Sequence, residues 1–162
     1  MERTENEAKH YQTFEDLEVY QVARGFRKAM YQVARRLPPE EKFALASQIL
    51  RAAVSVTNNI AEGHGRFHFL EQIKFMLQSR GSLEELLDDL NVCSDERYLP
   101  NQEIESLRQE GWRLHKLING YIRFLRRRVS GDSPRVQEGA DDDLEDFFLD
   151  RFNPSSFQPF NE

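Results

Sequence analysis

Basic side chains recur at helical spacing in two separate parts of the chain, and they could hold the phosphates of a nucleic acid. The residues concerned are Arg24, Lys28 and Arg35 in the first part and Arg113, Lys116, Arg123, Arg126, Arg127 and Arg128 in the second. Contacts of this kind hold a nucleic-acid backbone without reading its sequence. Exposed Lys and Arg are also the ordinary solvated surface of a helix, and cations favour a helix C-terminus. The pattern therefore fits RNA or DNA binding and also a plain solvated surface, and no helix-turn-helix, zinc-finger, RRM or KH pattern accompanies it.

Short polar residues recur at helical spacing within the stretch from Gln48 to Arg66. They lie beside an apolar seam at Ala46, Ile49, Ala53, Val56 and Ile60. A surface helix normally carries one apolar stripe and a charged back, whereas short polar groups can be buried only when they have hydrogen-bond partners. We expect this helix to be contacted on two sides, by its own core and by a partner subunit or ligand, although a solvated polar flank gives the same pattern. The predicted polar network or subunit interface comprises Gln48, Arg51, Ser55, Asn59, Glu62, Arg80, Gly81, Ser82 and Glu84.

Catalytic patterns are few, and the sequence predicts no catalytic residues, no metal site and no cofactor. His64, His68 and Glu71 have a spacing at which a metal site is conceivable, but no second acidic cluster adjoins them. Arg108 and His115 lie seven residues apart, which resembles the Arg-x(4–6)-His motif of HEPN ribonucleases. That resemblance makes a metal-independent ribonuclease a distant alternative. The sequence has no phosphate-binding glycine loop and no nucleophile elbow.

The elements that position these residues are predicted to be four helices. Thr13 and Asp16 predict a capping box at the start of the first helix. Pro39 suits the first turn of the second helix, and Gly63 is placed to end it as the residue after the C-cap. The fold class is all-α: an antiparallel up-down-up-down four-helix bundle with a flexible acidic C-terminal tail. In such a bundle the first and fourth helices are neighbours, so their basic outer faces are expected to merge.

The last two helices are predicted from their apolar seams. The third carries Ile73, Leu77, Leu83, Leu87 and Leu90, and the fourth carries Ile104, Leu107, Gly111, Leu114, Ile118, Tyr121 and Leu125. The alternating spacing of three and four in the fourth helix is typical of a bundle. Gly81 interrupts the third helix at a cost of about 1 kcal/mol relative to Ala. A close helix approach at Gly81 and Ser82 would offset that cost, with the polar flank of the second helix as the expected partner.

Charge and composition divide the chain into three parts: a flexible N-terminus (1–12), the bundle (13–129) and an acidic, Phe-rich tail (130–162). Residues 14–128 contain 18 Lys or Arg and 16 Asp or Glu, a net charge of +2, whereas residues 129–162 contain 2 and 9, a net charge of −7. The tail is expected to dock through Leu144, Phe147, Phe148 and Phe152, either on the basic faces or on a partner protein. The alternative is a disordered tail that only keeps the protein soluble. The single cysteine, Cys93, fits a buried thiol in a reducing cytoplasm. No apolar run is long enough to span a membrane.

The order of these motifs resembles one known family. QILRAAVSVTNNIAEG, preceded by LPPEEKFAL and followed by RGSLEELLDDL, is similar to the proteins encoded in intervening sequences of bacterial large-subunit rRNA genes, and the accessory proteins of diversity-generating retroelements look related. The resemblance covers about Phe14 to Arg128. It implies a non-catalytic antiparallel bundle, often a homopentamer. The first function that we expect is a nucleic-acid-associated adaptor that serves rRNA or a reverse transcriptase–RNA complex. The alternative is a protein-binding assembly module whose tail recruits a partner.

Overall fold

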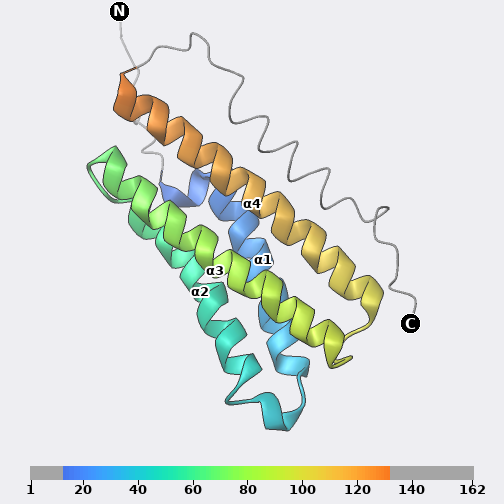
Figure 1. Ribbon diagram of the computed structural model, residues 1–162. Coiled ribbons are helices and arrows are strands. Elements are labelled where there is room, and N and C mark those ends of the chain that lie inside the picture. Colours follow the sequence, from blue (N-terminus) through green and yellow to red (C-terminus); the bar gives the residue numbers. More distant parts are fainter. Residues whose placement is uncertain (1–12, 132–162) are drawn as a thin grey trace, which may run out of the picture. The chain divides into compact units, whose positions relative to one another are not determined.

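The structure is a computed structural model, and it describes residues 13–131. Four long helices run antiparallel to their neighbours in the order up, down, up, down (Figure 1). The helices are α1 (Glu18–Arg36), α2 (Leu45–His64), α3 (Phe69–Asp95) and α4 (Asn101–Ser130), with short 3₁₀ turns η1 (Phe14–Asp16) and η2 (Pro39–Glu41). The predicted all-α four-helix bundle is confirmed. The predictions for residues 1–12 and for the tail, including Leu144, Phe147, Phe148 and Phe152, lie outside the described residues.

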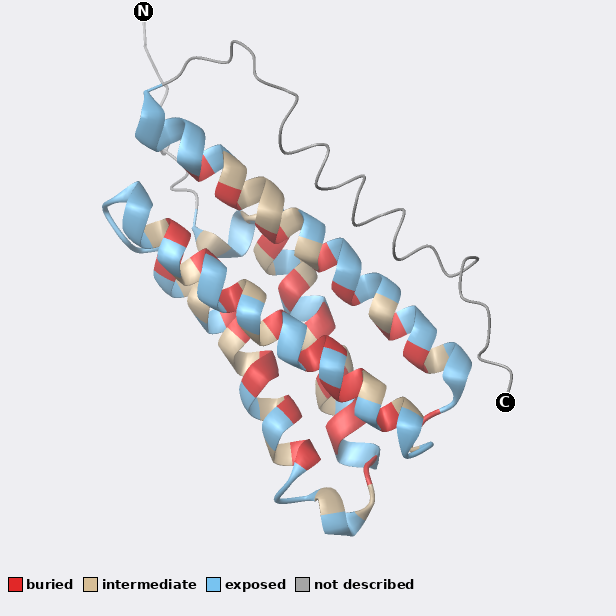
Figure 2. Cartoon of the chain, viewed as in Figure 1, coloured by how far each residue is buried: buried red, intermediate tan, exposed pale blue. Residues whose placement is uncertain are grey.

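The core follows the 3.6-residue period of each helix. Figure 2 shows the buried residues on the sides of the helices that face one another. Leu83, Leu90, Leu114 and Ile118 are fully buried, and burying each such side chain contributes about 1.5–3 kcal/mol. None of the described helices is both long and apolar enough to cross a membrane.

The seam predicted for α3 was wrong at one position. Leu77 is 36% exposed, because Met76 and Ser79 occupy the core positions between Ile73 and Leu83. Those four residues keep the three- and four-residue spacing of one helix face, and Leu77 lies beside that face. A buried serine therefore takes a place that an apolar residue was expected to fill, and its hydroxyl donates to the carbonyl of Val56 at 2.8 Å.

Helix starts differ from the predicted ones by a few residues. The Thr13 backbone N–H donates to Asp16 at 2.8 Å and the Glu15 N–H donates to the Thr13 hydroxyl at 3.2 Å, so the capping box is present. It caps the 3₁₀ turn η1, and α1 begins only at Glu18. Pro39 likewise opens η2, whereas α2 begins at Leu45. A 3₁₀ turn is a frequent short connector next to an α-helix, and a proline start favours it as much as an α-helix.

Gly63 does not end α2, and the prediction that it follows the C-cap was wrong. The helix continues through Gly63 to His64, and the C-cap residue is Gly65, with φ −75°. Gly63 is buried against α3, where an added Cβ would lie 2.9 Å from the Cβ of Phe75 and 3.4 Å from the carbonyl oxygen of Gln72. The glycine is therefore needed for the close approach of α2 and α3.

The single cysteine lies in the core, as predicted. Cys93 is fully buried on α3, and burial together with the nearby carboxylates of Asp89 and Glu41 raises the pKa of its thiol to about 11. The thiol is therefore protonated and shielded at neutral pH, which makes it a packing residue of the helix end.

Candidate nucleic-acid interface

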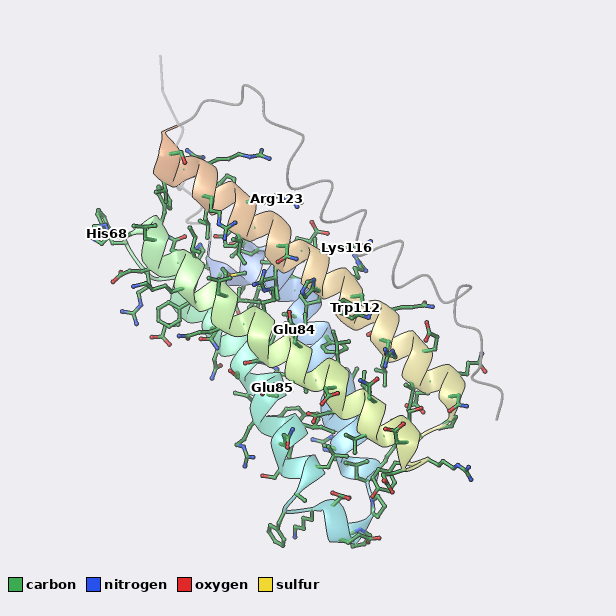
Figure 3. All side chains as sticks on the ribbon, in the orientation of Figure 1. His68, Glu84, Glu85, Trp112, Lys116 and Arg123 are labelled. Carbon is green, nitrogen blue, oxygen red and sulfur yellow. The ribbon has the colours of Figure 1, made fainter. Side chains whose placement is uncertain are left out.

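The outer face of α4 carries an aromatic residue followed by cations. Trp112, Lys116, Arg123 and Arg127 are separated by four, seven and four residues, a spacing that places them along one side of a helix. Figure 3 shows Trp112, Lys116 and Arg123 following one another along α4. Lys116 and Arg127 are exposed, Arg123 is half-buried, and Trp112 is 36% exposed. This arrangement offers positive charge for phosphates and a ring surface for a base.

The second half of α4 contains no acidic residue. Residues 111–131 include six Lys or Arg and no Asp or Glu, and the last three of these cations are Arg126, Arg127 and Arg128. The guanidinium of Arg128 lies 5.1 Å from the ring centroid of Phe124, which is 46% exposed and stacks on Tyr121. Part of this charge complements the negative end of the helix dipole. The remainder creates a positive field over about half of the helix.

The cations of α1 lie next to α2 and not only next to α4. Arg24, Lys28 and Arg35 are all exposed, on the side of α1 opposite its buried residues. Lys28 and Arg35 line a surface hollow whose other wall includes Val54 of α2. On the opposite flank of α1, Arg36 pairs with Glu103 of α4 at 2.8 Å through both carboxylate oxygens. An acidic residue thus lies between α1 and the start of α4, where the sequence led us to expect one continuous basic surface.

The polar flank of α2 is contacted by α3 of the same chain. The side-chain amide of Gln48 donates to Asp89 at 2.8 Å, and the hydroxyls of Ser55 and Ser82 share a hydrogen bond of 2.8 Å. Asn59 donates to the backbone carbonyl of Ser55 at 2.9 Å. These bonds satisfy the short polar groups that the sequence assigned to a network or an interface.

Other members of the predicted network lie apart from this contact. Arg51 donates to Ser47 at 3.0 Å on its own helix, and Glu62 pairs with Arg66 near the end of α2. Gly81 is exposed, and an added Cβ there would meet no neighbouring atom of the described residues within 4 Å. The predicted contact of α3 with the polar flank of α2 is therefore made by Ser82, which bonds to Ser55, and not by Gly81. Among the described residues, the close backbone approach of α2 and α3 occurs at Gly63.

Arg80 and Glu84 belong to a separate polar cluster between α3 and α4. Arg80 donates to the amide oxygen of Asn119 at 2.9 Å, and the Asn119 amide contacts His115 Nδ1 at 3.2 Å. His115 Nε2 lies 3.2 Å from a carboxylate oxygen of Glu84, which is 4.0 Å from Arg80. The four side chains close a ring that joins the two helices. The ring of Trp112 packs edge-on against His115, with centroids 5.3 Å apart.

The two residues of the ribonuclease alternative have different partners. Arg108 donates to Asn91 of α3, whereas His115 belongs to the cluster with Glu84 and Asn119. Each side chain is held in a structural contact of its own. Across residues 13–131 no group of three or more His, Cys, Asp or Glu side chains is arranged to hold a metal ion.

Asp89 is a buried acid that the sequence analysis did not single out. Its side chain is 2% exposed, and one carboxylate oxygen accepts from Gln48 while the other has no partner among the described residues. Burial, followed by the charges of Asp88 and Glu85, raises the pKa of Asp89 to about 6, against a smaller lowering by the Gln48 bond. A pattern could have shown this position, because Asp89 falls three residues after Leu86 and four before Cys93, on the apolar side of α3.

Arg27 and Asn119 were also missed, and no feature of the sequence distinguishes them. Arg27 is one of four cations within α1 residues 24–35, and only the structure shows that it donates to Thr57 of α2 at 2.8 Å. Asn119 is one of several polar residues on α4, and only its contacts with Arg80 and His115 give it a role.

Comparisons with known proteins agree with this architecture. The sequence profile of the 23S rRNA-intervening sequence protein family matches residues 15–120. Among solved structures, the chain is similar to a protein of unknown function from the S23 ribosomal protein family of Bacteroides thetaiotaomicron, with 22% sequence identity, a TM-score of 0.61, and coverage of 65% of this chain and 95% of the other. At that identity the likeness shows a shared fold. No curated protein matches the chain by sequence.

Proposed function

Because the chain belongs to the 23S rRNA-intervening sequence protein family, we propose that it is a non-catalytic, RNA-associated adaptor that binds RNA backbone through the basic faces of α4 and α1. The family name associates such proteins with intervening sequences of 23S rRNA, and RNA is therefore the nucleic acid that we favour over DNA. A reverse transcriptase–RNA complex is a second setting in which such an adaptor would serve.

One observation carries this proposal: the second half of α4 has six cations and no acid between residues 111 and 131. Ordinary solvated helices mix both signs of charge, and an acid-free stretch of this length attracts a polyanion. Trp112 and Phe124 add exposed aromatic surface to the same stretch. The contacts are to phosphates, and we therefore expect strong salt dependence and little sequence preference.

The test is RNA binding by the full-length protein at several salt concentrations. We expect Lys116→Glu with Arg127→Glu to lower affinity and to reduce the slope of log affinity against log salt by about 1.4–1.8, because two phosphate contacts are lost. Both side chains are exposed, so the fold should be retained. The readout is fluorescence anisotropy of a labelled RNA.

The matched control is Lys42→Glu with Arg97→Glu, which changes net charge equally at exposed positions outside α4 and outside α3. Its salt slope should remain close to that of the wild-type protein. An equal loss in both double variants would show that net charge alone governs binding, and α4 would then not be the interface.

We also propose that the adaptor is a closed homo-oligomer, with the outer face of α3 as the subunit contact. Leu70, Leu77 and Val92 are 60%, 36% and 37% exposed, and with Gly81 they recur along one side of α3. Exposed apolar residues around a glycine favour close packing of a second helix, and the occupant is a second copy of this chain. The family resemblance favours five copies.

Light scattering of the full-length protein is expected to give a multiple of 19.1 kDa, and Leu77→Glu is expected to shift the mass toward 19.1 kDa. The charge would have to be buried in the subunit contact, which is strongly unfavourable. Gln78→Glu adds the same charge at the next exposed position and should leave the mass unchanged. A wild-type mass of 19.1 kDa at micromolar concentration would refute the oligomer.

A further inference from the structure

Two adjoining hollows lie on the surface between α1 and α2. Their volumes are about 500 and 420 Å³, and both are lined by Tyr31 of α1 and Val54 of α2. Because the two hollows share these residues, we treat them together and call them the α1–α2 groove. The other residues of the groove are Arg27, Lys28, Gln32 and Arg35 of α1 and Leu50, Arg51, Ser55, Asn58 and Asn59 of α2.

The α1–α2 groove is positively charged along its length. Arg27, Lys28 and Arg35 line one hollow and Arg51 lines the other, while none of the described residues that line them is Asp or Glu. The sequence placed Arg51 in a separate network, and only the packing of α1 against α2 brings it to the same groove as Lys28 and Arg35. Four cations without a carboxylate select an anionic ligand.

Arg27 is held in place before any ligand arrives. Its guanidinium donates at 2.8 Å to the hydroxyl of Thr57, which is 1% exposed and itself donates to the carbonyl of Val54 at 3.1 Å. The hydrogen bond fixes one end of a planar donor group whose other N–H groups are suited to phosphate oxygens. A positioned guanidinium loses less conformational entropy on binding than an exposed flexible one.

The groove also offers what a nucleobase requires. The ring of Tyr31 is half-buried between the two hollows, and Leu50 and Val54 provide apolar surface beside it. Gln32 and Asn58 supply amide donors and acceptors for the edge of a base. Aromatic rings flanked by cations are the usual platform for unpaired bases, because a base can stack on the ring while its phosphates contact the cations.

We propose that the α1–α2 groove binds single-stranded RNA, with one base stacked on Tyr31 and the adjacent phosphates held by Arg27, Lys28 and Arg35. The proposal rests on the RNA-binding function proposed above and specifies that the bound RNA is single-stranded. A duplex keeps its bases stacked inside the helix, and a ring set between two protein helices cannot reach them. Single strands expose their bases, so the ring and the amides contribute only to their binding.

The experiment compares a labelled single-stranded RNA with a duplex of the same length, using the full-length protein. Tyr31→Leu is expected to weaken single-strand binding about five- to 150-fold, the range for loss of one stacked base, and to leave duplex binding unchanged. Tyr31→Phe keeps the ring and should bind as the wild-type protein does. Trp112→Leu is the comparison at the exposed aromatic residue of α4.

A second variant covers the possibility that Tyr31→Leu does not fold. Lys28→Glu with Arg35→Glu changes two exposed side chains and should lower the salt slope for single strands by about 1.4. If the wild-type protein binds RNA and neither variant alters single-strand binding, the groove assignment and the α1 part of the interface are wrong, while the proposed RNA binding through α4 stands. A loss in Trp112→Leu alone would move the stacking site to α4. A wild-type protein that binds no RNA would remove both proposals, and a changed oligomer mass in the groove variants would identify the groove as a subunit contact.

Discussion

The Asp89→Asn variant is expected to gain stability relative to the wild-type protein as pH rises from 4 to 8. The pKa of Asp89 is about 6 in the folded protein, against an ordinary value of 3.8. Between these values the folded protein holds a proton that the unfolded chain has released. The contribution of the protonated acid to stability is therefore complete below about pH 4 and is lost as pH rises through 6.

The expected size follows from the shift. Each pKa unit corresponds to about 1.4 kcal/mol, so the wild-type protein should lose up to about 3 kcal/mol from this group across the window. Asn cannot ionise, yet it keeps a carbonyl oxygen that can accept from Gln48, whose bond to Asp89 measures 2.8 Å. The amide group of Asn can itself change the free energy of unfolding by a constant amount. That amount does not vary with pH, so only the change with pH in the difference between the two proteins reports on Asp89.

Urea denaturation at pH 4, 5, 6, 7 and 8 measures this difference. Asp95→Asn, at an exposed position of the same helix, serves as the control. A difference between Asp89→Asn and wild type that stays flat from pH 4 to 8 would mean that Asp89 titrates as an ordinary carboxyl group.

Gly63→Ala is expected to destabilise the bundle, although alanine is the better helix former. The added methyl group would lie 2.9 Å from the Cβ of Phe75, an atom fixed to the backbone of α3 that cannot rotate away. Overpacking of this kind costs about 1–3 kcal/mol after the structure adjusts. Helix propensity returns about 1 kcal/mol, so the clash should outweigh it.

Gly25→Ala is the matched control for this prediction. Gly25 lies within α1, is exposed, and has no neighbouring atom within 4 Å of an added Cβ among the described residues. The same substitution should therefore raise the free energy of unfolding by up to about 1 kcal/mol. Thermal denaturation of both variants gives the comparison, and a stabilised Gly63→Ala protein would show that α2 and α3 do not pack closely at this glycine.

The long periodic helices could be predicted from the sequence because their core positions repeat. The seam of α4 from Ile104 to Leu125 is buried as the spacing indicates, apart from Tyr121, which is half-buried. Gly63 shows where such reasoning ends. A glycine near the end of an apolar helical pattern predicts the end of the helix. Only the close approach of α3 shows that Gly63 is a packing residue within the helix.

The residues of the candidate site could be predicted from the sequence, but the helix that lies beside them could not. The spacing of Lys28 and Arg35 placed both on the outer face of α1, which the structure bears out. Whether that face adjoins α2 or α4 depends on how the helices rotate about their axes, and this rotation is set by packing. The hydrogen bond from Arg27 to Thr57 of α2 and the ion pair of Arg36 with Glu103 of α4 show which sides of α1 face these two helices.

The burial of Cys93 makes its thiol a reporter of local opening of α3. The chain contains one cysteine, and its thiol is fully buried with a pKa raised to about 11. A thiol reagent can therefore react only in molecules whose α3 has opened. When closing is faster than the reaction, the labelling rate divided by that of a free thiol equals the fraction of open molecules. The modification, followed by mass spectrometry, would thus report the opening free energy of this helix under native conditions, with no denaturant and no engineered cysteine.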